Sequence, residues 1–326
     1  MSVLTDKEIN QWREQGYVLV QLPDHIWQDC KNVADDIFPK NRPEDFVDDF
    51  GGIGTKYDTS FPTKNFTINM LALNEDLLKI AQTLLKTDDI RLTQSELWCK
   101  YNTDTIASAK KTKLTNSNQR IHMDYGNHTW VHPSKWEDPD ILSCILYYDD
   151  SDICDGGTAV VPRQGQNDPA YAWPYTKQIG YGKHMQYLND RETCENYFKE
   201  NDPELYEFRK QLYEREVHAK FKPGTILLYR HDIWHRGRPI IPGTSRRVHN
   251  LVYRRADRER ILQWNVGFGW KNYSGYLEKV ITLASPMQRQ AIFFPKVGDK
   301  YWEDEDNVTA VYARYPGIDL RPYLKK

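Results

Sequence analysis

The stretch RIHMDYGN, residues 120–127, carries a histidine and an aspartate that are separated by one methionine. If this stretch forms a β-strand, alternate side chains point to the same side, so His122 and Asp124 project together and Met123 projects away. An imidazole and a carboxylate on one face can act as two ligands of a metal ion. Two ligands do not close a metal site, so the rest of the chain has to supply a third.

Two histidines in GTILLYRHDIWH, residues 224–235, are candidates for that third ligand. They are His231 and His235, and they can share a face because four positions separate them. Two histidines and one carboxylate on one side of a metal, with three positions left open, form the facial triad of non-haem Fe(II) oxygenases. The open positions allow the iron to bind a bidentate cosubstrate together with O₂.

The region around these residues is rich in short segments with a β-like pattern. Turn signals such as DGG and PG separate several of the segments, which is typical of an antiparallel sandwich or barrel. The segments are IRLTQSELWCKY, IHMDYGNHTWV, ILSCILYYDD, TAVVP, GTILLYRHDIWH and SRRVHNLVYRR. Helical patterns precede this region: a capping box begins a helix at Thr5, and two further helices are expected at about 25–38 and 73–86.

These patterns predict one domain over residues 1–326. Residues 1–89 form a support of helices and a strand, and a β core covers about 90–162 and 223–256. The insertion at 163–222 begins polar and aromatic, turns helical and is expected to act as a lid over an opening of the core. A C-terminal extension at 257–326 is expected to pack back on the core.

Composition limits the class of protein. Hydrophobic residues make up 39% of the chain and aromatic residues 13%, which is enough for a substantial core. The formal charge of -2 gives no global bias toward nucleic acid or a membrane surface. The five cysteines include no CxxC pair, and no signal peptide or apolar run of membrane-spanning length is evident. We therefore expect a cytoplasmic protein whose partner is a small molecule, with neither nucleic acid nor membrane bound.

Taken in order, these motifs resemble the phytanoyl-CoA dioxygenase-like branch of the Fe(II)/2-oxoglutarate-dependent oxygenases. The family has an HxD motif, then a distal histidine, then an arginine eleven residues further on. HMD at 122–124 matches the first motif, and the eleven-residue offset selects His235 and Arg246. His231 is then expected to be a structural strand residue or a polar group of the pocket.

Two further stretches carry the resemblance. LTDKEINQWREQGYVLV, residues 4–20, is similar to the N-terminal helix and strand of the family. YYDDSDICDGGTAVVPRQG, residues 147–165, is similar to its Asp-rich turn and the stretch that follows. The second stretch departs from the family at Arg163 and Gln164, which stand in place of the usual Gly-Ser-His.

The resemblance implies a mainly β fold with flanking helices, built on a double-stranded β-helix of the jelly-roll or cupin type. It implies that His122, Asp124 and His235 hold Fe(II) and that Arg246 binds the distal carboxylate of 2-oxoglutarate. O₂ would be the second cosubstrate. Hydroxylation of an unactivated C–H bond in a small biosynthetic metabolite, with release of succinate and CO₂, is the expected reaction, although desaturation and cyclisation stay open.

Other pocket residues are predicted as well. QSELWCK, residues 94–100, is similar to a Gln-Ser-x-x-x-x-Lys stretch of ectoine hydroxylase-type relatives, which implies that Gln94 and Lys100 contribute to cosubstrate binding. Alternation in SRRVHNLVY places Arg246 on one face with Asn250, and Arg247 on the other. The residues expected to contact substrate are Tyr125, Trp130, Tyr171, Trp173, Tyr175 and Asn250.

Alternative functions stay open on the sequence alone. A zinc hydrolase also uses two histidines and one carboxylate with an open water site, but it would not need Arg246. A non-catalytic β-sandwich binding protein would use the same residues as ordinary polar strand positions. Within the oxygenase family, an acyl-CoA or a protein side chain is the alternative substrate.

Overall fold

The computed structural model describes residues 4–44, 58–102, 117–124, 135–172, 188–258 and 276–324. The N-terminal support consists of α1 (Asp6–Gln15), β1 (Tyr17–Gln21), α2 (Asp24–Ile37), α3 (Phe66–Ala72) and α4 (Glu75–Leu85). The predicted capping box is present, because Thr5 and Glu8 exchange hydrogen bonds at the start of α1. Gly16 ends this helix at φ 87°, and a Cβ at that position would lie 2.9 Å from the Trp136 ring.

Two antiparallel sheets form the β core. The larger sheet has the strand order β1-β6-β3-β8-β2, and the smaller sheet has the order β5-β4-β7. Besides β1, the strands are β2 (Ile90–Asn102), β3 (Ile141–Tyr147), β4 (Ala159–Val160), β5 (Val217–His218), β6 (Thr225–Arg230), β7 (His235–Arg236) and β8 (Thr244–Arg255). Strands that are far apart in the sequence lie side by side in both sheets, which is the topology of a jelly-roll core.

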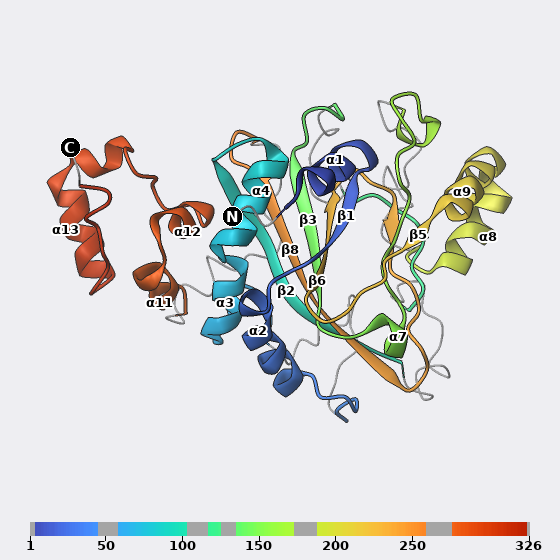
Figure 1. The fold of residues 1–326 in the computed structure, drawn as a ribbon, viewed down its shortest axis with the longest axis horizontal. Helices are drawn as coiled ribbons and strands as arrows, with labels where there is room; N and C mark the ends of the chain where they lie inside the picture. Colours follow the sequence, from blue (N-terminus) through green and yellow to red (C-terminus); the bar gives the residue numbers. More distant parts are fainter. Residues whose placement is uncertain are drawn as a thin grey trace.

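The two faces of the larger sheet pack against different layers. Alternate residues such as Leu251 and Tyr253 join the core cluster that includes α2, α3 and α4. Their neighbours on the opposite face, such as Val248 and Tyr147, join a second cluster with Val160 of the smaller sheet. Figure 1 shows the helices α2 and α3 on one side of the larger sheet and β5 on the other. We call the face turned toward the smaller sheet the inner face.

The insertion and the C-terminal extension are largely helical where the structure describes them. A short helix, α7 (Ser151–Cys154), and a 3₁₀ turn at Pro169–Tyr171 precede α8 (Arg191–Asn201) and α9 (Pro203–Arg215). The extension contains α11 (Tyr276–Leu283), α12 (Pro286–Ala291), a 3₁₀ turn at Lys300–Glu303 and α13 (Glu305–Arg314). The extension packs on the core as predicted, because α12 contacts β2 and α4. Among the helices described, none is both long and apolar enough to cross a membrane.

The prediction of a strand around the HxD motif is wrong for residues 121–124, the part of that stretch that the structure describes. Residues 117–124 form only isolated bridges, one of which pairs His122 with His235. The backbone partner changes within two residues, because the Asp124 N–H donates to the His231 carbonyl 3.1 Å away. The strand predicted over 224–235 is likewise interrupted: β6 ends at Arg230, and the chain turns before β7 begins at His235.

Candidate metal centre

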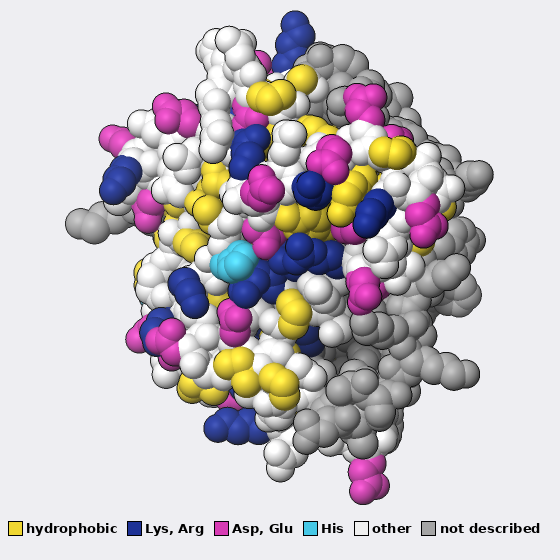
Figure 2. Space-filling model, turned by 90° about the vertical axis from the view of Figure 1, so that its right-hand side faces the viewer, with side chains coloured by type: hydrophobic (Ala, Val, Ile, Leu, Met, Phe, Trp, Pro, Cys, Tyr) yellow, Lys and Arg dark blue, Asp and Glu magenta, His cyan; other side chains and the backbone are white. Residues whose placement is uncertain are grey.

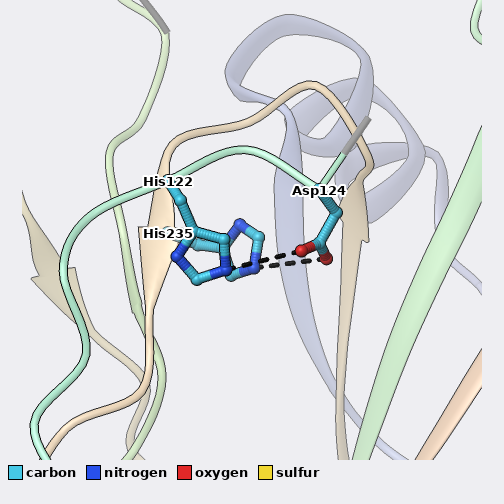
Figure 3. Close-up of side chains that lie close together, drawn as sticks. All are labelled: His122, Asp124 and His235. Atoms are coloured by element: carbon cyan, nitrogen blue, oxygen red, sulfur yellow. Dashed lines mark ion pairs between the residues drawn. The ribbon is translucent and has the colours of Figure 1, made fainter. Parts of the chain in front are cut away.

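Three predicted ligand side chains meet at one point between the sheets (Figure 3). His122 Nε2 lies 3.4 Å from one carboxylate oxygen of Asp124, and His235 Nε2 lies 3.3 Å from the other. The centroids of the two imidazole rings are 4.5 Å apart. The ligand atoms of all three residues lie within 4.8 Å of one another, a spacing at which one metal ion can contact all of them.

Backbone pairing holds the two histidines in register. The N–H of His122 donates to the His235 carbonyl at 2.9 Å, and the N–H of His235 donates back at 2.8 Å. Asp124 is placed by the hydrogen bond of its N–H to the turn between β6 and β7. Although the motif is not a strand, its aspartate still projects beside the two rings.

The other ring nitrogen of each histidine faces a backbone carbonyl. His122 Nδ1 lies 3.0 Å from the Arg120 oxygen, and His235 Nδ1 lies 3.1 Å from the Ile233 oxygen. A carbonyl can only accept, so each Nδ1 carries the proton and donates it. This tautomer leaves both Nε2 lone pairs for a metal, which is the arrangement that orients imidazole ligands in metal centres.

The charges of the site favour a bound cation. Burial tends to raise the pKa of Asp124, but His235 and His122 beside it outweigh burial and hold that pKa well below its usual range. Burial tends to lower the pKa of His235, yet the Asp124 carboxylate raises it. Burial, together with the neighbouring His235, lowers the pKa of His122 to about 4. The carboxylate is therefore ionised and His122 is neutral at pH 7, while a bound cation would have to displace any proton from His235 Nε2.

Further residues support the carboxylate. The Tyr229 hydroxyl of β6 donates to Asp124 Oδ2 at 3.3 Å. Sequence reasoning missed Tyr229, although its place two residues before His231 in the β6 pattern was a usable signal. His231 is not among the three grouped ligands, and its Nδ1 lies 2.7 Å from the Ser143 hydroxyl. These contacts fit the structural or pocket role expected for His231.

Arg246 lies on the inner face of β8, as its alternation predicted. Its side chain is buried, and its Nε and Nη1 have no hydrogen-bond partner among the described residues. A buried guanidinium with unused donors is suited to a carboxylate ligand. Arg247 points the other way and pairs with Asp149 and with Asp35 of α2. The two arginines therefore lie on opposite faces of β8, as their alternation predicted, and Arg247 is a buried structural residue. The cosubstrate role of Arg246 stays a prediction.

The two predicted cosubstrate residues of β2 also lie on the inner face. Lys100 is the cross-strand partner of Arg246, and its Nζ donates to the Arg238 carbonyl at 3.2 Å. Gln94 is buried, and its Nε2 donates to Glu96 Oε2 at 3.0 Å. Sequence reasoning did not select Glu96, although it alternates with Gln94 along the strand.

The predicted substrate contacts are only partly covered by the structure. Tyr125, Trp130, Trp173 and Tyr175 lie outside the described residues. Tyr171 is buried; its hydroxyl donates to the Val161 carbonyl and accepts from the Trp234 N–H. A structural role accounts for these contacts, so a substrate role of Tyr171 stays a prediction. Asn250 lies on the inner face, four residues after Arg246.

Residues 2–248 match the family described as phytanoyl-CoA dioxygenase (PhyH). The match covers most of the chain and includes all three grouped ligands and Arg246. The chain belongs to the phytanoyl-CoA dioxygenase family. No curated protein matched it. The family is one of non-haem iron oxygenases, so this member is an oxidoreductase that uses Fe(II), 2-oxoglutarate and O₂.

A solved structure with a similar fold supports the same architecture. EctD from S. alaskensis, solved with 2-oxoglutarate and 5-hydroxyectoine, is 16% identical with a TM-score of 0.50. That alignment covers 82% of this chain and 80% of EctD. SnoK, a non-haem α-ketoglutarate-dependent carbocyclase from nogalamycin biosynthesis, is 15% identical with a TM-score of 0.49, over 78% of this chain and 85% of SnoK. The predicted double-stranded β-helix fold is confirmed.

Proposed function

We propose that this protein hydroxylates an unactivated C–H bond of a small-molecule metabolite, with His122, Asp124 and His235 holding Fe(II) and Arg246 binding 2-oxoglutarate. The observation that carries the proposal is the pairing of two features inside one β core. One is a buried His-Asp-His group with both Nε2 atoms turned toward the carboxylate. The other is a buried arginine with unused donors on the inner face. A zinc hydrolase would need the first feature alone.

The residues of the site match what this chemistry demands. Bound Fe(II), 2-oxoglutarate and O₂ supply the oxidant that converts C–H to C–OH while the cosubstrate becomes succinate and CO₂. Arg246 would hold the far carboxylate of the cosubstrate through two charge-assisted hydrogen bonds, which a planar guanidinium forms best. Buried apolar side chains of the inner face, including Leu227 and Val248, limit the access of water to the reacting centre.

Surface charge fits an anionic cosubstrate. Figure 2 shows Lys and Arg side chains gathered in a hollow on the face that carries the smaller sheet. Positive charge within a hollow raises the local concentration of a dicarboxylate such as 2-oxoglutarate. EctD was solved with the small molecule 5-hydroxyectoine, and we assign the same class of substrate to this chain rather than an acyl-CoA or a protein side chain.

Anaerobic reconstitution tests the proposal. Purified protein is loaded with Fe(II), the bound iron is counted, and succinate is measured after O₂ is admitted with 2-oxoglutarate. We expect one iron per chain and succinate release in the wild type, and loss of both in Asp124→Ala and His235→Ala. The matched control is His25→Ala, because the His25 side chain is 71% exposed. Full iron binding by either ligand variant would refute the assignment, and turnover with zinc but without 2-oxoglutarate would indicate a hydrolase.

A further inference from the structure

A cavity lies outside the metal centre, between the end of α1, the end of α4 and the segments around residues 136–139 and 162–166. Its volume is about 780 Å³, which is within the usual range for sites that bind small organic ligands. Among the residues described, its lining includes none of the three metal ligands and not Arg246. The proposed reaction therefore gives this cavity no role.

Contacts between these segments fix the walls of the cavity. Trp136 Nε1 donates to the Arg13 carbonyl at 2.7 Å, and the Arg163 N–H donates to the Gln15 carbonyl at 3.1 Å. The guanidinium carbon of Arg230 lies 3.9 Å from the centroid of the Trp136 ring. These contacts join α1 to two loops and to the end of β6, so the cavity is a preformed feature of the fold.

Three positively charged side chains of the lining have no carboxylate partner in the described part of the chain. They are Arg13, Lys86 and Arg163, and none of them forms an ion pair there. A fourth cation of the lining, Arg230, is neutralised by Asp232, because its Nη2 lies 2.8 Å from a carboxylate oxygen of that residue. The charge that a ligand would meet therefore comes from the first three side chains.

Arg163 is held in place by its neighbours. Its guanidinium carbon lies 4.5 Å from the centroid of the Trp136 ring, and its Nη2 donates to the Gln166 carbonyl at 3.1 Å. These contacts orient the planar guanidinium and leave its Nη1 without a partner among the residues described. Arg163 and Gln164 are also the residues that stand in place of the usual Gly-Ser-His, so the family pattern does not supply this charge.

Two acidic side chains, Glu14 and Glu137, limit the charge that the cavity can accept. Both are exposed, and neither pairs with a cation in the described part of the chain. Three unpaired cations less two carboxylates leave the lining with a net charge of +1. One negative charge balances this lining, whereas the several charges of an acyl-CoA would meet the two glutamates. Trp136 and Pro162 provide apolar surface for the uncharged part of a ligand.

We propose that this cavity binds a small organic carboxylate at a site separate from the metal centre, with Arg163 and Arg13 as the charge partners of the carboxylate group. A guanidinium offers a carboxylate two parallel N–H donors, and charge-assisted hydrogen bonds of this kind are the strong ones. The inference goes beyond the proposed function and does not depend on it, because the described lining residues take no part in that reaction.

Ligand-observed saturation-transfer NMR tests the site without knowledge of the natural ligand. The intact protein is loaded with diamagnetic Zn(II) and one equivalent of 2-oxoglutarate, and it is titrated with benzoate, benzyl alcohol or benzylamine, which share a ring and differ in charge. The wild type is expected to bind benzoate at least about tenfold more tightly than the alcohol or the amine. Arg163→Gln and Arg13→Gln should each lower benzoate affinity about tenfold, whereas the control Lys210→Gln, at an exposed cation of α9, should not.

A variant with the opposite expected effect guards against a folding defect. Glu137→Gln removes an exposed carboxylate from the lining and is expected to tighten benzoate binding several-fold, a gain that misfolding cannot produce. Equal wild-type affinities for benzoate and benzyl alcohol, or full benzoate affinity in both arginine variants, overturn the inference. Tighter binding of phenyl phosphate than of benzoate also overturns it, because a net charge of +1 balances a single negative charge.

Discussion

Arg246 and Arg247 are adjacent in the sequence, and the structure predicts opposite consequences for their removal. Arg246 is buried on the inner face, and two of its nitrogens have no partner among the described residues. Arg247 is buried on the other face, where its guanidinium pairs with Asp149 and Asp35. Removing Arg246 should therefore weaken cosubstrate binding with little loss of stability, and removing Arg247 should do the reverse.

The size of each effect follows from the partner that is lost. Loss of one member of a buried, hydrogen-bonded charge pair costs about 2–5 kcal/mol of binding, so Arg246→Ala should weaken 2-oxoglutarate binding between about 30-fold and 4000-fold. Arg247→Ala leaves the partly buried Asp149 without its cation, a loss that costs about 3–5 kcal/mol for a fully buried pair. Because the Asp35 side chain is 36% exposed, we expect a smaller loss of unfolding free energy, about 2–3 kcal/mol.

The assay measures both quantities in each variant. Titration of 2-oxoglutarate into the anaerobic Fe(II) protein gives the dissociation constant, and denaturant unfolding of the same preparation gives the free energy of unfolding. Arg246→Lys serves as the conservative variant: it keeps the charge but loses the planar fork, and its affinity should fall between wild type and alanine. If Arg247→Ala lost the affinity and Arg246→Ala lost the stability, the assignment of faces on β8 would be wrong.

Three other substitutions test separate parts of the structure. Asp124→Asn should bind iron far more weakly than wild type, as measured by metal content after dialysis, because the site loses its only anionic ligand among the three. Tyr213→Phe removes a hydroxyl that accepts from the Ile121 N–H, and iron affinity should fall about tenfold, the scale for groups that orient a ligand. Burial lowers the pKa of His249 to about 3, so the unfolded chain binds a proton near pH 6.5 and the native one does not. Stability should therefore fall by about 2 kcal/mol as the pH drops from 6.5 to 5, and His249→Gln should lose this slope in denaturant unfolding. An unchanged slope in that variant would place the titration elsewhere.

Much of the β core could be predicted because alternation along a strand is a local signal. β8 is the clearest example, since its period of two separates Arg246, Val248 and Asn250 from Arg247, Leu251 and Tyr253. The helices α2 and α4 were predicted for a similar reason, because their apolar residues recur at helical spacing. Each of these elements buries one face, and the spacing of apolar residues within the segment itself identifies that face.

The HxD stretch shows where local reasoning fails. Its partners are His235 and the turn at His231, more than a hundred residues away, so no pattern within the stretch reveals that pairing ends after one bridge. The three ligand side chains still lie together, because individual backbone hydrogen bonds place them where a regular strand ladder was expected to. Glu96 was missed for a different reason: a charged residue in a strand pattern is normally assigned to a solvated face, and only the fold shows that this position is buried.

The insertion is the part of the chain whose predicted role changes most. The side chain of Arg209 on α9 is completely buried, and its Nη2 donates to the Ile121 carbonyl at 3.1 Å. Tyr213, one turn later, accepts from the N–H of the same residue at 2.9 Å and donates to Glu195 of α8. Both backbone groups of the residue before His122 are thus held by the helical hairpin. A hairpin that swung open like a lid would break these buried hydrogen bonds and release a metal ligand, so α8 and α9 act as a fixed support of the metal centre rather than as the lid that the sequence predicted. Deleting residues 166–184 should then raise 2-oxoglutarate turnover that is not coupled to product, whereas disrupting α9 should lower iron affinity itself.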